Sequence, residues 1–546
     1  MDYKKLADML FPNITKTISY YEETLFPDRG LADGAKVTRL APSPTGFIHL
    51  GNLYGAFVDE RLAHQSNGVF ILRIEDTDEK RKVEGAVETI INSLEFFDLR
   101  FDEGAGINGE TGNYGPYFQS NRAEIYQTVA KHLIEMGRAY PCFCSEEELS
   151  KIREQQIAEN VNTGYYGKWA VDRDLTLEEV KKHLDNNDSF VIRFKSMGNP
   201  EDTFEIDDAI RGRISSPVNF QDIVLLKANG IPTYHFAHVV DDHLMRVTHV
   251  VRGEEWLSTL PIHYELFTTL GWDLPVYCHT AHLMKMDNGV KRKLSKRKDP
   301  ELGLEYYMQL GYHPAAVREY LMTILNSNFE EWRIQNPDSS IDDFPFTLDK
   351  MSNSGALFDL NKLNDVSKNV LVKIPATEIY DFLLNWAKEY KKEIVNPLTE
   401  HKDAVIKLLD VGRNSDKPRK DLIYCEQIFD FISYYFDEYF KIVDNYPENI
   451  DDQEAKKLLK AYLETYNHSD DQNQWFEKIR VIAAENGYAP KPKDYKKNPE
   501  MYKGHVGDVS TVIRIAIMGR STSPDIWELQ QIMGEEKVRN RIQSLI

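Results

Sequence analysis

The sequence predicts an α/β domain with a parallel sheet, followed by an all-α region toward the C-terminus. The first observation behind this prediction is a strand–helix–strand pattern over residues 37–74. The second is a pair of further apolar runs, at residues 221–226 and 247–251, which are typical of buried strands. The third is a change after about residue 373, where the apolar spacing becomes helical and predicts a helical bundle.

The strand–helix–strand unit contains a shaped loop. Its first strand is expected at residues 37–41 and carries Arg39, and the next residues that disfavour regular structure are Pro42, Pro44 and Gly46. One face of a helix is then predicted by apolar residues spaced three or four apart: Leu50, Leu53, Tyr54, Phe57, Val58 and Leu62. The mostly apolar residues 69–74 predict the second strand.

This loop delivers His49 and Gly51 to the first turn of the predicted helix. Unpaired N–H groups and partial positive charge at a helix N-terminus suit a phosphate group. Gly51 lets a ligand approach the backbone, and His49 adds a side-chain donor. The alternative is an ordinary helix start with a surface histidine.

A run of positive charge lies far downstream, at residues 291–298, which read KRKLSKRK. Such a run is usually a solvated face or an interaction tail. Because this one lies in mid-chain, before Asp299 and Pro300, and in a chain of net charge −21, we expect a loop inside a domain. Lysines placed beside a helix N-terminus would bind a triphosphate.

These segments resemble motifs of a known enzyme family. PSPTGFIHLGN is similar to the HIGH motif of class I aminoacyl-tRNA synthetases, and KLSKR is similar to their KMSKS loop. Five further segments resemble glutamyl-tRNA synthetases, in the family's order: RLAPSPTG, LRIEDTD, YGPYFQS, PTYHFAHVVDDHLM and VVRGEEW. The resemblance implies a Rossmann-type catalytic domain that ligates L-glutamate to tRNA(Glu) with ATP, through a glutamyl-adenylate, for protein synthesis.

The resemblance also implies how the chain is divided. It places an N-terminal helical extension at residues 1–36 and the catalytic domain at 37–300, with an acceptor-end-binding insertion at about 108–210. A stem-contact region at 301–370 and a helical anticodon-binding region at 371–546 would follow. Local patterns add helices at 304–310 and 314–325, and a hairpin at Asn229-Gly230 between two apolar runs.

Site residues follow where positions match the family's motifs. The residues implied in catalysis are His49, Lys293 and Lys296. The nucleotide would be bound by His49, Gly51, Glu255, Trp256 and Lys296. Glutamate would be bound by Arg39, Ser43, Glu75, Tyr234, His238 and Arg252.

Within this set, Glu75 is expected to bind the α-ammonium of glutamate, and Arg39 and Arg252 its γ-carboxylate. An arginine at a strand end is more often an ion-pair partner, and Glu254 or Asp242 would be the partner of Arg252. At His238 family members often carry Asn, a departure that would alter how the substrate α-carboxylate is held.

Cofactor and partner expectations follow from the same resemblance. ATP would be a substrate and bring Mg²⁺, whereas Cys142 and Cys144 lack a third cysteine near Trp169, so no structural zinc is expected. Four cysteines do not predict a disulfide framework, and no targeting or membrane-spanning segment is evident. We therefore expect a cytoplasmic monomer, in which a local basic face binds tRNA(Glu) despite the acidic composition.

Three alternatives are weighed against this interpretation. A glutaminyl-tRNA synthetase is disfavoured by Arg252, because an amide substrate does not need a second cation. A non-catalytic tRNA-binding paralogue is disfavoured by the presence of His49, Lys293 and Lys296. A truncated relative that modifies tRNA would lack the long helical C-terminal region.

Overall fold

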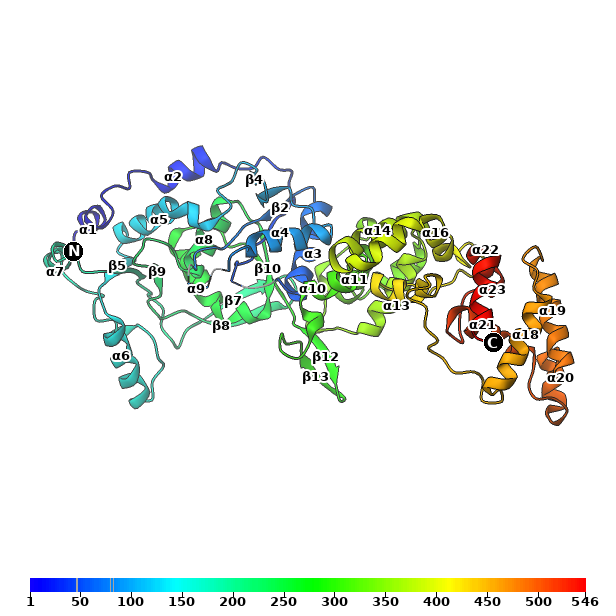
Figure 1. Ribbon diagram of the computed structural model, residues 1–546. Helices are drawn as coiled ribbons and strands as arrows, with labels where there is room; N and C mark the ends of the chain where they lie inside the picture. The colour runs from blue at the N-terminus through cyan, green and yellow to red at the C-terminus, as the bar shows by residue number, and fades with distance from the viewer. Residues whose placement is uncertain (46–47, 79, 82) are drawn as a thin grey trace. The chain divides into compact units, whose positions relative to one another are not determined.

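The computed structural model describes the chain except for residues 46, 47, 79 and 82, so Gly46 of the predicted loop lies outside the described residues. The chain divides into two compact units (Figure 1). The first comprises residues 1–306 and 321–359, and the second comprises residues 307–320 and 360–546. Among the described residues, no helix is long and apolar enough to cross a membrane.

The first unit is built on the predicted parallel sheet. β1 (Val37–Leu40) pairs in parallel with β2 (Val69–Leu72), which pairs in parallel with β3 (Glu103–Gly106). β4 (Gly109–Thr111) continues the sheet in the antiparallel direction. The crossover between β1 and β2 is α3 (Leu50–Gln65), whose apolar face is buried, so the strand–helix–strand prediction is confirmed.

A second parallel pair, β10 (His249–Gly253) and β11 (Val276–Thr280), lies beside β1. The backbone N–H of Thr248 donates to the carbonyl of Val37 at 2.9 Å, where both strands begin. Further along, Arg39 reaches the carbonyl of Val251. β1 and β10 therefore run the same way, and their carboxyl ends meet at the edge where open α/β sheets bind ligands.

In the sequence between β4 and β10 lies a large insertion with its own sheet. β5 (Ala139–Cys142), β6 (Val191–Phe194) and β9 (Val224–Leu226) form three antiparallel strands, and β7 (Thr203–Asp208) pairs with β8 (Gly212–Pro217). The helices of this part and its neighbours in the first unit are α4 (Ala86–Phe96), α5 (Ala123–Glu135), α6 (Glu146–Ala158), α7 (Leu177–Asp185), α9 (Leu260–Leu270) and α12 (Phe329–Gln335).

The hairpin predicted at Asn229-Gly230 is wrong in its second arm. A turn does form, and backbone hydrogen bonds of 2.9 Å join Lys227 to Ile231 and Thr233 to Leu225, beside the bridge between Leu226 and Pro232. The chain then enters α8 (Tyr234–Leu244). The apolar residues of this run also fit a helical period, and Phe236, Val240 and Leu244 are buried on α8, so tertiary packing outweighed the local turn signal.

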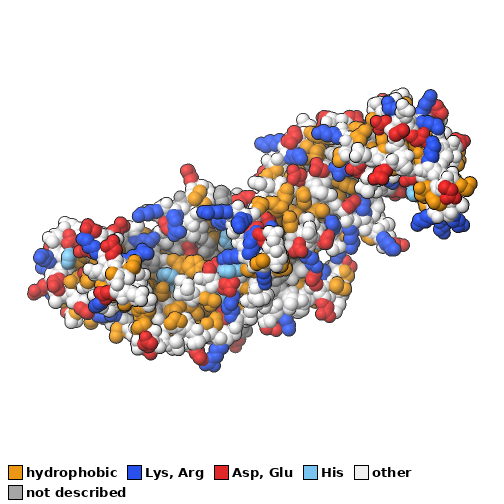
Figure 2. Space-filling model, turned by 90° about the horizontal axis from the view of Figure 1, so that it is seen from below, with side chains coloured by type: hydrophobic (Ala, Val, Ile, Leu, Met, Phe, Trp, Pro, Cys, Tyr) orange, Lys and Arg blue, Asp and Glu red, His pale blue; other side chains and the backbone are white. Residues whose placement is uncertain are grey.

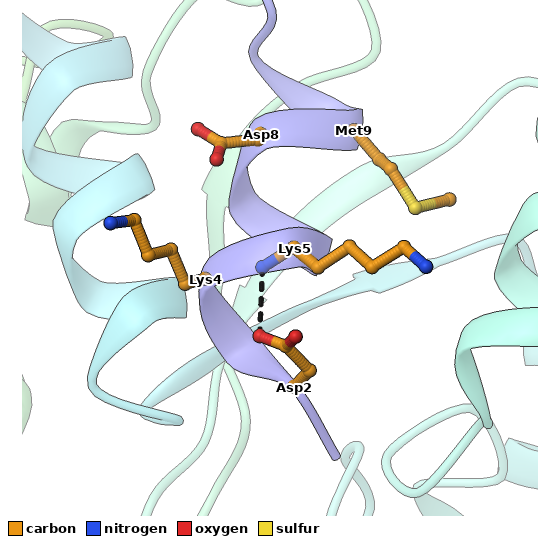
Figure 3. A pocket seen from close by; sticks show the side chains of 5 residues that line it. All are labelled: Asp2, Lys4, Lys5, Asp8 and Met9. Carbon is orange, nitrogen blue, oxygen red and sulfur yellow. Dashed lines mark hydrogen bonds between the residues drawn. The ribbon is translucent and has the colours of Figure 1, made fainter.

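The N-terminal extension is part of the first unit and contains α1 (Tyr3–Leu10) and α2 (Ile18–Tyr20). It packs against α5. Leu6, Ala7 and Leu10 are buried, and Lys131 of α5 pairs with Asp8 at 2.8 Å. Figure 3 shows the outer side of α1, where the Asp2 carboxylate accepts the N–H of Lys5 at 3.1 Å. The residues around this shallow surface pocket are Asp2, Lys4, Lys5, Asp8 and Met9.

The basic run belongs to a hairpin of β12 (Leu283–Asp287) and β13 (Val290–Lys293), next to the short β14 (Ala356–Leu357). The expectation of a loop over 291–298 is therefore wrong for its first three residues, which lie in β13. Asn288 and Gly289 make the turn, with φ of 49° and 82°. An exposed hairpin needs little apolar pattern, so its charged strand gave no periodic signal.

The second unit is helical, as predicted, and it has one large apolar core. Within that core the Tyr462 hydroxyl accepts a hydrogen bond from Trp475 Nε1 at 3.0 Å. α10 (Leu304–Leu310) and α11 (Pro314–Leu325), each of which lies only partly in this unit, have the predicted bounds. The later helices are α13 (Leu360–Leu371), α14 (Ala376–Tyr390), α15 (Val395–Glu400), α16 (Lys402–Asp410), α17 (Cys425–Ile432), α18 (Asp452–Thr465), α19 (Gln472–Glu485), α20 (Pro492–Lys497), α21 (Val506–Met518), α22 (Ile526–Met533) and α23 (Glu535–Gln543).

Candidate functional site

His49 is the N-cap of α3, and its ring is oriented by a reciprocal pair of hydrogen bonds. His49 Nδ1 accepts the backbone N–H of Asn52 at 3.3 Å, and Asn52 Oδ1 accepts the N–H of His49 at 3.1 Å. Burial, and next the charge of Lys296, lower the pKa of His49, so the ring is neutral at pH 7. Because Nδ1 is an acceptor, the ring proton lies on Nε2, and the Nε2–H group can serve as a hydrogen-bond donor.

Gly51 keeps this histidine in place. A Cβ at position 51 would lie 3.0 Å from Cε1 and 3.1 Å from Nδ1 of His49, closer than a side chain normally packs. A larger residue would therefore require the imidazole to shift by a few tenths of an ångström. The glycine predicted to admit a ligand also makes room for the ring that would contact it.

The structure brings the two lysines of the KLSKR segment near His49. The charges of Lys296 and Lys293 both lower the pKa of His49, whereas the charge of Glu255 opposes them. Lys293 Nζ lies 3.1 Å from His282 Nε2, and His282 Nδ1 lies 3.4 Å from a carboxylate oxygen of Glu255. Lysines and a carboxylate from segments far apart in the sequence thus lie near the start of α3.

Arg39 lies in β1 and shares a buried carboxylate. Its Nε contacts both oxygens of Asp242, at 3.2 and 3.1 Å. Arg73 Nη1 binds the same carboxylate at 2.6 Å, and Arg73 Nη2 binds Glu75 at 3.2 Å. Burial opposes ionisation of Asp242, but Arg39 and Arg73 outweigh it and hold its pKa well below the usual range. The charge of Arg39 is thus largely compensated within the protein.

Arg252, at the end of β10, has a different environment. Its Nε donates to His279 Nε2 at 3.0 Å, and its Nη1 lies 3.1 Å from His263 Nδ1. Arg252 Nη2 is buried and has no hydrogen-bond partner. Glu254 instead pairs with Arg211, and Asp242 pairs with the two other arginines. Among the described residues no carboxylate forms an ion pair with Arg252, so the predicted alternative of a structural ion pair is wrong.

Tyr234 and Trp256 lie on the same side of the site, with ring centroids 4.5 Å apart. Burial, and next the charge of Glu75, raise the pKa of Tyr234 to about 12, so its hydroxyl stays protonated. Glu75 itself is buried, and burial raises its pKa although Arg73 and Arg39 act in the opposite direction. A bound ammonium group would favour the ionised form of this carboxylate.

His238 and Ser43 occupy less direct positions. His238 Nδ1 lies 2.9 Å from Asp242, and His238 Nε2 lies 3.3 Å from the Tyr277 hydroxyl. Burial lowers the pKa of His238 to about 4, so the ring is neutral and both nitrogens face protein groups. Ser43 is exposed in the loop after β1.

Sequence reasoning missed Arg73 and considered Asp242 as a partner of Arg252, whereas Asp242 pairs with Arg39 and Arg73. Arg73 and Asp242 lie inside segments that carry the resemblance, and a charged residue within a buried apolar run was the available signal. His263, His279 and Asp208 gave no signal, because they come from α9, β11 and β7 and meet only in the folded chain.

A separate cluster of metal-ligand types lies in the insertion. The sulfur atoms of Cys142 and Cys144 and a carboxylate oxygen of Asp172 all lie within 4.8 Å of one another. The Tyr165 hydroxyl is 3.5 Å from Cys142 Sγ and 3.3 Å from Cys144 Sγ. Asp172 was not expected there, so the two thiols have a third potential ligand, and the absence of zinc stays a prediction.

Comparison with protein families finds two matches. A model described as tRNA synthetases class I (E and Q), catalytic domain, matches residues 36–365. A model described as anticodon binding domain matches residues 500–546.

Two similar proteins and one similar solved structure are named as glutamate–tRNA ligases. A glutamate–tRNA ligase of Acetivibrio thermocellus is 88% identical over 546 residues and covers 100% of both chains. One from Clostridium perfringens strain 13 is 50% identical and covers 99% of this chain and 100% of its own. A crystal structure of a glutamate tRNA ligase from Elizabethkingia meningosepticum, in complex with its amino acid, has a TM-score of 0.73 at 27% identity, covering 93% of this chain and 99% of that one.

Proposed function

The chain belongs to the class I tRNA synthetases of the glutamate and glutamine type, and on that premise we propose that it ligates L-glutamate to tRNA(Glu) with ATP. The observation that carries the choice of amino acid is the state of Arg252. Its guanidinium is buried, has no carboxylate partner among the described residues and leaves Nη2 unpaired. Such a cation suits the γ-carboxylate of glutamate, whereas the amide of glutamine supplies no charge.

In the first step, an α-carboxylate oxygen of glutamate attacks the α-phosphorus of ATP, and the bond to pyrophosphate breaks. The carboxylate is already ionised, so the reaction needs no general base. The protein contributes position and positive charge, from His49 Nε2–H, the N–H groups near Gly51, Lys293 and Lys296. Mg²⁺ bound to the phosphates of ATP would share their negative charge. We assign Lys296 to the developing charge of the transition state, and Glu255 and Trp256 to the rest of the nucleotide.

Glutamate would be recognised at both of its ends. The Glu75 carboxylate accepts hydrogen bonds from the α-ammonium group. Arg252 and the remaining N–H groups of Arg39 bind the γ-carboxylate. Tyr234 and Ser43 add hydroxyl donors. His238 acts through Asp242 and Tyr277, which its two nitrogens face. In the second step, the 2′-hydroxyl of the tRNA 3′ ribose attacks the carbonyl of the adenylate and AMP leaves.

The wider organisation is assigned with the family as a guide. Residues 37–300 form the catalytic domain, and their insertion at about 108–210 contacts the acceptor end of the tRNA. Residues 301–370 contact the tRNA stem, and residues 371–546 bind the anticodon. On the face that Figure 2 shows, Lys and Arg side chains lie among Asp and Glu side chains. We propose that local groups of these cations hold tRNA, although the net charge of the chain is negative. We propose a cytoplasmic monomer.

The assignment is tested by aminoacylation with purified tRNA(Glu) and tRNA(Gln), each with glutamate and with glutamine. We expect glutamate on tRNA(Glu), and Arg252→Gln should lower kcat/KM for glutamate and narrow the preference over glutamine by at least roughly a hundredfold. Arg138→Gln is the matched control, because it removes an arginine that pairs with Glu265 outside the site. An unchanged preference in Arg252→Gln would refute the assignment of Arg252.

A further inference from the structure

We infer that Asp208, His279 and His263 form a positioning set, which holds Arg252 by neutral acceptors and leaves its full positive charge for the substrate. The inference rests on the proposed binding of the γ-carboxylate by Arg252. It explains a contrast in the buried site: Arg39 is held by a carboxylate, whereas Arg252 is held by two imidazoles.

The protonation of both histidines follows from their contacts with Arg252. A guanidinium has only donors, so a nitrogen at hydrogen-bond distance from it must present a lone pair. His279 Nε2, at 3.0 Å from Arg252 Nε, and His263 Nδ1, at 3.1 Å from Arg252 Nη1, are therefore unprotonated. Each ring is neutral and carries its proton on the other nitrogen.

Asp208 selects the tautomer of His279. One oxygen of the Asp208 carboxylate lies 2.6 Å from His279 Nδ1 and accepts the His279 backbone N–H at 3.1 Å. The carboxylate also accepts the N–H groups of Ile210 and Arg211, at 3.0 and 2.9 Å. Asp208 ends β7 of the insertion, so the β7–β8 hairpin sets the orientation of an arginine in the parallel sheet.

His263 is oriented from the opposite side. Its Nε2 carries the proton and donates to His235 Nδ1, which lies 3.1 Å away. His263 is completely buried on α9, and His235 lies in the first turn of α8. The Tyr277 ring lies against one face of the Arg252 guanidinium, with its centroid 4.7 Å from Cζ. The set thus constrains Nε, Nη1 and one face of the guanidinium, and it leaves Nη2 as the unpaired donor.

The use of neutral acceptors has a consequence for affinity. A carboxylate at position 279 would satisfy the same N–H but would also cancel the charge of Arg252, and it would compete with the γ-carboxylate. An imidazole fixes the geometry without that competition. The set therefore orients the Arg252 guanidinium, and the γ-carboxylate of glutamate compensates its charge.

The test compares three substitutions at one position in the full-length enzyme. His279→Gln keeps a neutral acceptor near the place of Nε2, His279→Leu removes the acceptor, and His279→Glu adds a competing charge. In aminoacylation of tRNA(Glu), we expect KM for glutamate to stay within about threefold for Gln, and to rise about tenfold for Leu and at least about a hundredfold for Glu, with smaller changes in kcat. Equal KM values in all three variants, whether normal or raised, would overturn the inference.

Controls separate this inference from its premise and from misfolding. His243→Gln alters a histidine that pairs with Glu22 and does not contact Arg252, so its KM should not change. If Arg252→Gln leaves the preference for glutamate over glutamine intact, the proposed role of Arg252 fails; if that preference collapses while the His279 series is flat, only the positioning set fails. Thermal unfolding is measured for each variant, and if His279→Glu does not fold, the comparison of Gln with Leu decides.

Discussion

Arg292 and Asp299 form a bidentate ion pair across the turn that carries Lys296. Arg292 Nη1 and Nη2 lie 2.7 and 2.8 Å from the two oxygens of Asp299. The same carboxylate accepts the backbone N–H of Ser295 at 2.9 Å. The hydrogen bonds from Arg292 are the largest influence and hold the pKa of Asp299 well below its usual range. The pair therefore closes the turn and limits where Lys296 can lie.

Loss of this pair should slow catalysis more than it weakens binding. Asp299→Ala releases Arg292 and the N–H of Ser295, so we expect kcat of aminoacylation to fall about tenfold with KM for glutamate within about twofold, because the lysine is no longer prepositioned. Asp287→Ala, which removes the other partner of Arg292, is the control and should have a smaller effect. A kcat that is unchanged in Asp299→Ala would show that the turn does not need the pair.

The two functions of His49 can be separated by substitution. His49→Asn keeps a capping acceptor for the N–H of Asn52 but cannot place a donor where Nε2 lies, so we expect normal stability and a fall in kcat of about a hundredfold. His49→Ala should lose the same activity and also about 1 kcal/mol of stability from the lost cap. Denaturant unfolding and steady-state kinetics on both variants check this. Equal stability of the two variants would count against the capping role.

Lys296 should act mainly in the transition state. Lys296→Ala is expected to lower the single-turnover rate of adenylate formation about a hundredfold or more, while glutamate affinity changes little. Lys298→Ala, two residues further along, is the matched control for loss of one positive charge. A single-turnover rate equal to that of the unmodified enzyme would exclude the role given to Lys296.

The pKa of Glu75 predicts how glutamate affinity depends on pH. Burial raises this pKa, and only the ionised carboxylate attracts the α-ammonium, so KM for glutamate should rise as pH falls toward the acidic end. Between about pH 5.5 and 8 the charges of free glutamate are constant, so the substrate does not contribute. Glu75→Gln should have a high KM without this acid limb. A flat KM in the unmodified enzyme would contradict the assignment.

The purified protein should contain no stoichiometric zinc. Structural zinc sites are typically tetrahedral with thiolate and imidazole ligands, and here two thiols are joined by one carboxylate that already accepts the N–H of Phe143 at 2.7 Å. The hydrogen bond between the two thiols lowers the pKa of Cys142 to about 6 but raises that of Cys144, so only Cys142 is readily available as the thiolate that a metal requires. Elemental analysis is the check, and one tightly held zinc per chain would overturn the prediction.

The sequence alone determined the elements whose signal is local. The unit of β1, α3 and β2 and the bounds of α10 and α11 follow from apolar spacing and from residues that start or stop a helix. Such signals depend on neighbours within a few positions, so a single chain contains them in full.

Tertiary structure decided the features whose partners are distant. The strand β13 is hidden in a run of charge, and the run after Asn229-Gly230 forms α8 because its apolar residues pack as a helix. The environment of Arg252 depends on Asp208, His263 and His279, which three separate elements bring to one buried point. Spacing in the sequence cannot report whether an arginine meets a carboxylate or an imidazole, because that contact arises only when the sheet, the insertion and α9 pack together.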